Sequence, residues 1–211
     1  MAITSLTQLI EYWACRSCLF YYLSWLYYRG MVRREVELAK ITRADHVLVV
    51  GGGPCPHTAI QIHRLTGARV TVVDNDFLCV RSAIRLLERL GIADMVQVLH
   101  RHGQNLKTDQ YTVVVLALQL TPKLEIIRAM ERQAKQGDRI LIRLAKDSLA
   151  DWYSPLDQVQ FVNLPAVTHN QFSNVKQTVL YQVKEVESNE STQDKDSVSS
   201  NRLYPAHAFA G

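Results

Sequence analysis

The chain has 211 residues, of which 47% are hydrophobic, and a formal net charge of +4. Its length is enough to bury one core, so we expect a single domain with terminal additions. The scattered positive charge does not predict a nucleic-acid-binding protein. The four cysteines show neither a secreted disulfide framework nor the spacing of a zinc site, so we expect a cytoplasmic protein without a metal centre.

Residues 1–45 predict a helical N-terminal segment rich in aromatic side chains. The stretch 9–28 is apolar over about the length of a membrane span, but Glu11 and Arg16 interrupt it. Its tyrosines and tryptophans recur at helical spacing, which favours a helix that packs on the rest of the chain or on a second copy in a homodimer. A helix that lies on a membrane surface is the alternative.

From residue 46 onwards, short apolar runs alternate with helical segments. Strands are expected at 46–50, 69–73, 95–99, 112–118, 139–144, 159–164 and 177–183, and helices at 58–65, 77–90 and 123–135. Helices between short apolar strands predict right-handed crossovers and a doubly wound, mostly parallel sheet. The last two strands are joined too closely for a helix and are expected to form a hairpin.

Seven strands that end in a hairpin are typical of the class I methyltransferase type of Rossmann-like fold and fit an NAD-binding domain less well. We therefore expect an α/β ligand-binding domain over residues 46–184. Residues 185–211 are polar and cannot bury much surface, so we expect a disordered tail there.

The stretch "HVLVVGGGPCPHTAIQIHRL", residues 46–65, runs from an apolar strand through three glycines into a helix. Gly51 and Gly53 allow a tight turn and the close approach of a ligand to the backbone. A dinucleotide loop needs a small third residue where Pro56 stands, and Pro54 and Pro56 remove two N–H groups that a pyrophosphate requires. A sulfonium cofactor needs no such cradle, so we expect S-adenosylmethionine rather than NAD.

The second expected strand ends at Asp74, whose carboxylate is placed to accept hydrogen bonds from both ribose hydroxyls. A strand-end turn is the alternative for this residue, and Asp76 suits the N-cap of the helix from residue 77. After the third strand, Gly103 and Gln104 are expected along the adenine. The expected cofactor-binding residues are therefore Gly51, Gly52, Gly53, Asp74, Asn75, Gly103, Gln104 and Ala117.

Five segments in the same order resemble the nicotianamine synthase family, which includes bacterial enzymes that make opine-type metallophores. They are "VGGGPCPHTA", "VVDND", "YTVVVLALQL", "ILIRLAKDSLADWYSPLD" and "HNQFSNVKQTVLYQ". The resemblance covers roughly residues 27–183, and the paired prolines of the loop are its most specific element. Plant-type members carry a large helical domain before the Rossmann part, where this chain has about 45 residues.

The resemblance implies transfer of the 3-amino-3-carboxypropyl group of S-adenosylmethionine to a small amine or amino acid, with release of methylthioadenosine. The sulfonium activates the methyl carbon as well, and the carbon that lies in line with the nucleophile, about 3 to 3.5 Å away, reacts. A small-molecule methyltransferase is therefore the alternative. A Rossmann-like binding module without activity is a third hypothesis.

The segment "YYRGMVRREVELAK" resembles the family's tyrosine-containing helix that leads to a glutamate. On this resemblance Glu35 is the expected catalytic base that accepts the amine proton, with Tyr28 nearby. The alternative is a solvated Glu35 on an exposed helix, where "RREVE" makes local ion pairs.

Arg143, near the end of the fifth strand, and Tyr153, after that strand, are expected in the acceptor part of the site. Arg143 can meet a substrate carboxylate with its planar fork, or else form a structural pair with Asp138 or Asp147. Tyr153 is expected to wall the substrate pocket. His57, at the start of the first helix of the domain, suits the cap region better than the role of a base.

Overall fold

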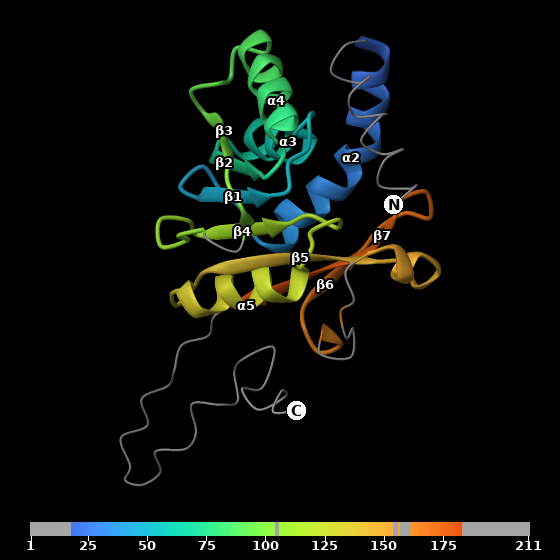
Figure 1. Ribbon diagram of the computed structural model, residues 1–211. Helices are drawn as coiled ribbons and strands as arrows, with labels where there is room; N and C mark the ends of the chain where they lie inside the picture. Colours follow the sequence, from blue (N-terminus) through green and yellow to red (C-terminus); the bar gives the residue numbers. More distant parts are fainter. Residues whose placement is uncertain (1–17, 104–105, 154–155, 157–160, 183–211) are drawn as a thin grey trace, which may run out of the picture.

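The computed structural model describes residues 18–103, 106–153, 156 and 161–182 (Figure 1). Its strands are β1 (His46–Val50), β2 (Arg69–Asp74), β3 (Val96–His100), β4 (Val113–Leu116), β5 (Arg139–Ala145), β6 (Ala166–Thr168) and β7 (Val175–Gln182). Its α-helices are α2 (Cys18–Leu38), α3 (His57–Thr66), α4 (Phe77–Arg89) and α5 (Lys123–Gln133), with a 3-10 helix at Asp147–Trp152.

The strands form one seven-stranded sheet in the order β3-β2-β1-β4-β5-β7-β6. Strands β1 to β5 are parallel, as right-handed crossovers require. The central strands β1 and β4 are buried along nearly their whole length because helices cover both faces. The prediction of a doubly wound, Rossmann-like sheet of the class I methyltransferase type is confirmed.

Alternate residues of each strand belong to two different cores. Val49, Val72 and Val115 pack on the face covered by α2, α3 and α4. Val50 and Leu116 pack on the opposite face, where α5 lies. The period of two in the strands thus sends neighbouring valines and leucines to two separate helical layers.

The C-terminal hairpin is confirmed, since β6 and β7 pair antiparallel at the edge of the sheet. The strand predicted at 159–164 is wrong. Residues 161–164 form a turn, closed by Leu164 N donating to Phe161 O at 3.1 Å, and the Phe161 side chain is buried in the core. The apolar run therefore supplies a core side chain, and the strand starts after Pro165, whose carbonyl accepts from Leu180 N. Residues 159 and 160 lie outside the described part.

Helix α2 belongs to the same core as the sheet, because Val32 is fully buried there. Its N-terminal half is more exposed, and Tyr22, Leu23 and Leu26 keep about half of their surface open. Within residues 18–182, gaps aside, no helix is both long and apolar enough to span a bilayer. The predicted helix before residue 18 and the tail 185–211 lie outside the described residues.

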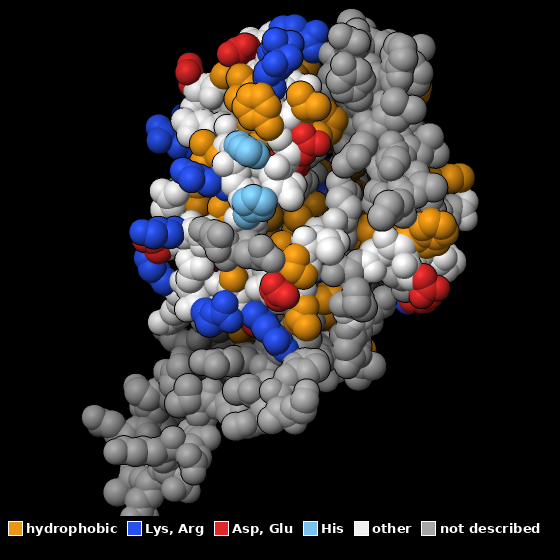
Figure 2. Space-filling model, viewed as in Figure 1, with side chains coloured by type: hydrophobic (Ala, Val, Ile, Leu, Met, Phe, Trp, Pro, Cys, Tyr) orange, Lys and Arg blue, Asp and Glu red, His pale blue; other side chains and the backbone are white. Residues whose placement is uncertain are grey.

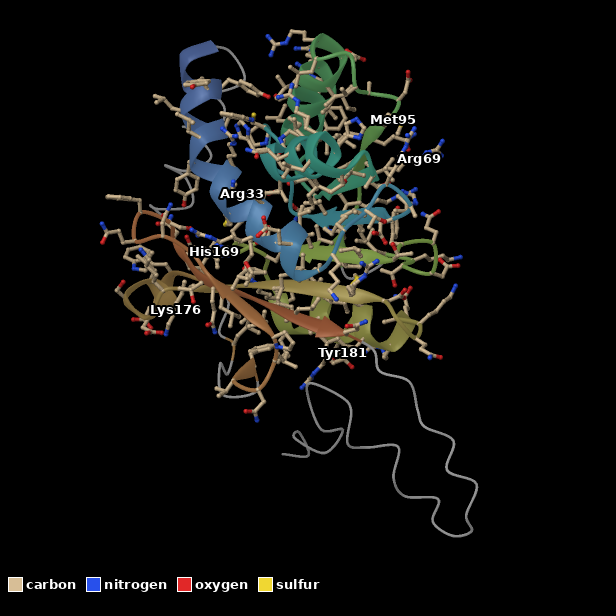
Figure 3. All side chains as sticks on the ribbon, turned by 180° about the vertical axis from the view of Figure 1, so that it is seen from behind. Arg33, Arg69, Met95, His169, Lys176 and Tyr181 are labelled. Atoms are coloured by element: carbon tan, nitrogen blue, oxygen red, sulfur yellow. The ribbon has the colours of Figure 1, made fainter. Side chains whose placement is uncertain are left out.

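Lys and Arg side chains are distributed over several places on the face shown in Figure 2, with Asp and Glu between them. On the opposite side of the molecule, Figure 3 shows His169 of the β6–β7 hairpin beside the C-terminal half of α2. This contact joins the two ends of the described chain, and Arg34 Nη1 donates across it to Thr168 O at 3.4 Å.

Candidate functional site

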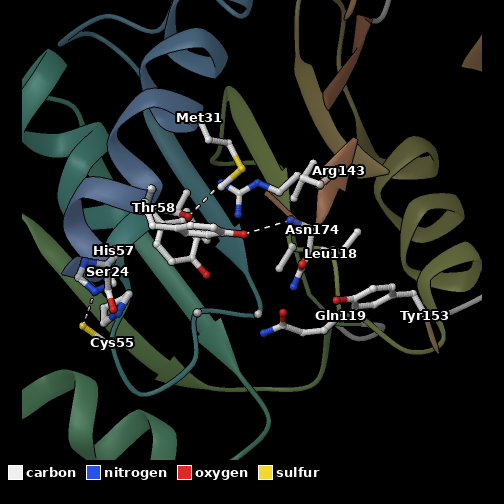
Figure 4. Close-up of a pocket in the computed structure, with 18 of the residues that line it drawn as sticks. Ser24, Met31, Cys55, His57, Thr58, Leu118, Gln119, Arg143, Tyr153 and Asn174 are labelled. Atoms are coloured by element: carbon white, nitrogen blue, oxygen red, sulfur yellow. Dashed lines mark hydrogen bonds between the residues drawn. The ribbon is translucent and has the colours of Figure 1, made fainter. Parts of the chain in front are cut away.

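A cavity of about 450 Å³ lies at the carboxyl ends of β1, β4 and β5, beneath α2 (Figure 4). Parallel α/β sheets bind ligands at this edge. Four groups of residues line it: the loop after β1 with the start of α3 (Gly51, Gly52, Cys55, Pro56, His57, Thr58), the end of β4 (Ala117, Leu118, Gln119), one face of α2 (Leu23, Ser24, Tyr27, Tyr28, Met31), and Arg143, Tyr153, Phe172, Asn174 and Val175. Val49 completes the wall.

The glycine loop takes a backbone path that other residues do not follow readily. Gly51 and Gly53 have φ angles of +84° and +64°, in the left-handed region. A Cβ on Gly52 would lie 2.1 Å from Val72 Cγ1, so the loop rests directly on β2. Gly51 and Gly52 also line the cavity, so a ligand there can contact their backbone.

Asp74 holds the glycine loop against the end of β2. Its Oδ2 accepts from Gly53 N at 2.8 Å and its Oδ1 accepts from Asp76 N at 3.0 Å. Asp76 in turn caps α4 by accepting from the N–H groups of Leu78 and Cys79, which confirms the predicted N-cap. Asp74 thus takes part in a strand-end turn as well as standing beside the loop, and its contact with a ribose stays a prediction.

The expected cofactor residues fall into two groups. Gly51, Gly52 and Ala117 line the cavity. Gly53, Asp74, Asn75 and Gly103 are not among the described residues that line it, and Gln104 lies outside the described residues. The second group follows β1, β2 and β3 on the outer part of the same sheet edge, where the adenosine of the predicted cofactor would extend.

Glu35 and Arg143 form a buried ion pair, although 108 residues separate them in the chain. Arg143 Nε donates to Glu35 Oε1 and Nη2 donates to Oε2, each at 2.8 Å. Glu35 has no exposed surface, and Arg143 keeps only 4% of its surface exposed while lining the cavity. Nη2 also donates to Thr58 Oγ1 at 3.0 Å, which ties the guanidinium to the first turn of α3.

Both charges of this pair are retained at neutral pH. Burial by itself raises the pKa of the Glu35 carboxyl, but the charge of Arg143 and the hydrogen bonds from Arg143 and Thr178 outweigh it and hold the pKa below its usual value. Burial would lower the pKa of Arg143, and the Glu35 carboxylate reverses this and raises it. The pair is therefore a bidentate carboxylate–guanidinium contact between two ionised groups.

This geometry corrects two expectations, the solvated Glu35 and the aspartate partner of Arg143. Glu35 is not a solvated surface residue; the exposed local pair of α2 joins Arg33 to Glu37 at 3.8 Å. Glu35 is not itself among the described residues that line the cavity, but it contacts Arg143, which is, and its role as the catalytic base stays a prediction. The structural partner of Arg143 is Glu35 and neither of the two expected aspartates. Asp138 accepts from Lys135 N, and Asp147 pairs with Lys176 at 2.7 Å.

Two residues that the sequence reasoning missed complete the pair from behind. Thr178 lies opposite Arg143 in the β5–β7 register, and its Oγ1 donates to Glu35 Oε1 at 2.7 Å. His169 Nε2 lies 2.8 Å from Thr178 Oγ1. Because the single hydroxyl proton of Thr178 goes to the carboxylate, Thr178 must accept from His169 Nε2–H, which assigns the tautomer of the imidazole. The one signal in the sequence was Thr178 itself, a polar residue within the apolar run of the last strand.

Tyrosines of α2 and of the segment after β5 form the outer wall. Tyr28 stacks on His57 with ring centroids 5.5 Å apart, and Tyr27 Oη accepts from Asn174 N at 3.1 Å. Burial raises the pKa of Tyr153, so its phenol stays protonated at neutral pH. The structure places Tyr28 and Tyr153 in the wall of the cavity, and their roles toward a substrate stay predictions.

His57 is the first residue of α3 and is almost fully buried. Burial, together with the charge of Arg64, lowers its pKa to about 4. Its Nε2 lies 3.1 Å from the Sγ of Cys55, which also lines the cavity. A neutral imidazole with so low a pKa is a poor proton acceptor at neutral pH, in agreement with its assignment to the cap region.

Lys123 is a second buried cation that the sequence did not reveal, with 2% of its surface exposed. Its Nζ donates to Arg143 O at 2.6 Å and to Leu118 O at 3.3 Å. Burial, with the nearby charge of Arg143, lowers its pKa to about 7. Lys123 therefore joins the ends of β4 and β5 directly behind the cavity wall.

Among the described residues, no group of three or more His, Cys, Asp and Glu is arranged to hold a metal ion.

No protein-family model matches the chain, and no curated protein matches it by sequence. Among solved structures, a Glu-to-Gln variant of the nicotianamine synthase MtNAS in complex with S-adenosylmethionine has a TM-score of 0.71 at 21% identity, over 86% of this chain and 75% of that chain. MtNAS in complex with MTA and tNA has a TM-score of 0.70 at 21% identity, over 84% and 70%.

An RNA methyltransferase from Salinibacter ruber, in complex with S-adenosyl-L-homocysteine, has a TM-score of 0.58 at 20% identity, over 79% of this chain and 97% of that chain. These likenesses define the class of fold: a Rossmann-like sheet of the class I S-adenosylmethionine-dependent transferase type. Within that class, the nicotianamine synthase structures resemble this chain more than the RNA methyltransferase does, as the sequence segments indicated.

Proposed function

We propose that the chain is an S-adenosylmethionine-dependent transferase that moves the 3-amino-3-carboxypropyl group to a small amine or amino acid and releases methylthioadenosine. The observation that carries the proposal is the cavity of about 450 Å³ that continues from the glycine loop to Arg143 and the tyrosines of α2. A cavity on this side of the loop has room for the amino-acid arm of the co-substrate and for an acceptor.

The residues of the loop fit this co-substrate. Gly51 and Gly52 line the cavity, which allows backbone contact with it, and the carboxylate of Asp74 stands at the end of β2, where the ribose is expected. In the reaction, the nitrogen lone pair of the acceptor forms a bond to the γ-carbon of the arm. The bond from that carbon to sulfur breaks, its electron pair stays on sulfur as a neutral thioether, and the nitrogen releases a proton to solvent.

The walls contribute by excluding water and orienting the two reactants. Tyr27, Tyr28 and Tyr153 present aromatic surface to the cavity, which attracts cationic groups such as a sulfonium or an ammonium. Arg143 is the one side chain with a stable formal charge among the described lining residues, so it attracts a carboxylate. Methyl transfer in the same cavity is the alternative, because the sulfonium activates both carbons.

Product analysis tests the proposal. The protein is incubated with S-adenosylmethionine and a panel of amino acids, and the nucleoside products are separated by chromatography. Methylthioadenosine supports the proposal, whereas S-adenosylhomocysteine would identify a methyltransferase. Neither product, with no heat of binding in calorimetry, would leave a binding module. Gly53→Val is the matched control, because a β-branched residue does not adopt φ +64° without strain and should remove the activity.

A further inference from the structure

The guanidinium of Arg143 is held from behind on two of its three nitrogens. Nε and Nη2 donate to Glu35, and Nη2 donates also to Thr58. None of the hydrogen bonds found among the described residues uses Nη1. Since Arg143 lines the cavity (Figure 4), Nη1 is the guanidinium nitrogen that remains to donate hydrogen bonds to a ligand.

The residues behind Arg143 form a continuous chain of hydrogen bonds. It runs from His169 Nε2 to Thr178 Oγ1 at 2.8 Å, from Thr178 to Glu35 Oε1 at 2.7 Å, and from Glu35 to Arg143. Glu35 and Thr178 have no exposed surface, and His169 keeps 9%. A buried chain of hydrogen bonds of this kind holds a side chain in one orientation, although His169 Nδ1 is buried without a hydrogen-bond partner among the described residues.

We propose that Arg143 Nη1 binds the α-carboxylate of the 3-amino-3-carboxypropyl arm of S-adenosylmethionine, and that Thr178 and His169 are positioning residues that orient Arg143 through Glu35. The inference rests on the binding of S-adenosylmethionine in the proposed function and does not depend on which of its carbons is transferred.

Two observations favour the arm of the co-substrate over the acceptor as the source of this carboxylate. The hydrogen bond to Thr58 attaches Arg143 to the first turn of α3, which follows the glycine loop, so the guanidinium belongs to the co-substrate side of the cavity. In addition, every molecule of S-adenosylmethionine brings a carboxylate, and Arg143 is the cation of the described lining that can neutralise it. Anchoring the far end of the arm restricts the position of its γ-carbon.

The test compares three ligands in calorimetry: S-adenosylmethionine, its decarboxylated form, and methylthioadenosine, which lacks the arm. The wild-type protein should bind S-adenosylmethionine about tenfold to a hundredfold more tightly than the decarboxylated form, as expected for a hydrogen bond to a charged group. The double variant Glu35→Gln/Arg143→Met removes both charges together, so that neither stays buried without a partner. It should lose this preference while binding methylthioadenosine as the wild type does.

A matched pair of variants tests the positioning residues. Thr178→Val removes the hydroxyl at nearly constant volume and should reduce the preference for the carboxylated ligand about threefold to tenfold, whereas Thr178→Ser keeps the hydroxyl and should restore it. His169→Phe, which removes the donor to Thr178, should act in the same direction as Thr178→Val.

Each other outcome has a distinct meaning. A double variant that keeps the full preference for S-adenosylmethionine overturns the inference, and a rise in acceptor KM alone would assign the carboxylate to the acceptor. Equal loss of affinity for all three ligands also overturns it, because Arg143 would then only support the fold. Absence of S-adenosylmethionine binding by the wild type would instead refute the co-substrate of the proposed function.

Discussion

The substitution Glu35→Gln tests the buried ion pair most directly. The carboxylate accepts two hydrogen bonds from Arg143 and one from Thr178. Glutamine keeps one acceptor oxygen, but its NH2 group faces a donor of Arg143 whichever way the amide is turned, so one of the two hydrogen bonds is lost. The variant therefore leaves Arg143 as an almost fully buried cation without its counter-ion.

Removing one partner of a buried ion pair typically costs about 3–5 kcal/mol. For a chain of this size, each kcal/mol lowers the midpoint of thermal unfolding by about 2–4 °C, so we expect a decrease of about 6–20 °C for Glu35→Gln. The matched control is Glu37→Gln on the same helix. Glu37 is exposed and pairs with Arg33 at 3.8 Å, so its substitution should leave the midpoint nearly unchanged.

The pH dependence of this difference has a defined sign. Because the pKa of Glu35 is lowered in the folded protein, its stabilising effect is fully present above the pKa of the unfolded chain, about 4.3, and is lost as pH falls through the folded pKa. The gap between wild type and Glu35→Gln should narrow accordingly in acid. Thermal unfolding followed by circular dichroism measures both effects, and a Glu35→Gln midpoint as high as that of Glu37→Gln would refute the reasoning.

Three further predictions concern the loop and the buried lysine. Asp74→Ala should weaken S-adenosylmethionine at least tenfold in calorimetry, since hydrogen bonds to a charged group contribute about 1.5–3 kcal/mol each, and an unchanged Kd would exclude the ribose contact. Gly52→Ala should abolish the binding of S-adenosylmethionine because its Cβ would meet Val72 Cγ1 at 2.1 Å. The control Gly30→Ala, whose Cβ would have no atom within 4 Å, should bind normally, and equal affinities of the two variants would contradict this reasoning. Burial and the charge of Arg143 lower the pKa of Lys123 from 10.5 to about 7, so the unfolded chain binds more protons than the folded chain between these values. The free energy of unfolding of the wild type, measured in urea, should therefore rise between pH 7 and 9 relative to that of Lys123→Met, by at most about 1.4 kcal/mol per pH unit. Parallel pH profiles of the two proteins would refute this prediction.

The sequence by itself determined the order of strands and helices from β1 to β5 and the loop that borders the cavity. Strand β1 matches its predicted bounds, and the bounds of α3 and α4 agree within one residue at each end. Apolar periodicity is a local property, so it is readable without the rest of the chain. The three glycines after β1 also indicated the edge of the cavity, because a backbone with positive φ favours glycine and is therefore visible in the sequence.

Edge strand β6 was misplaced because its local signal is weak. It has three residues, two of them exposed, and lies beside a more apolar run whose Phe161 is drawn into the core. Pairing with β7 rather than hydrophobic pattern defines this strand. Short edge strands depend on their neighbour in this way, since they bury little surface of their own.

The roles of the charged residues were decided by the tertiary structure alone. Glu35 and Arg143 are 108 residues apart, and Thr178 reaches Glu35 across 143 residues. In the sequence, Glu35 stands among charges that suggest a solvated helix face, and nothing local shows that its own turn of α2 faces the sheet. Ionisation and orientation depend on burial and on partners brought together by the fold, and these are properties of the folded chain rather than of any segment.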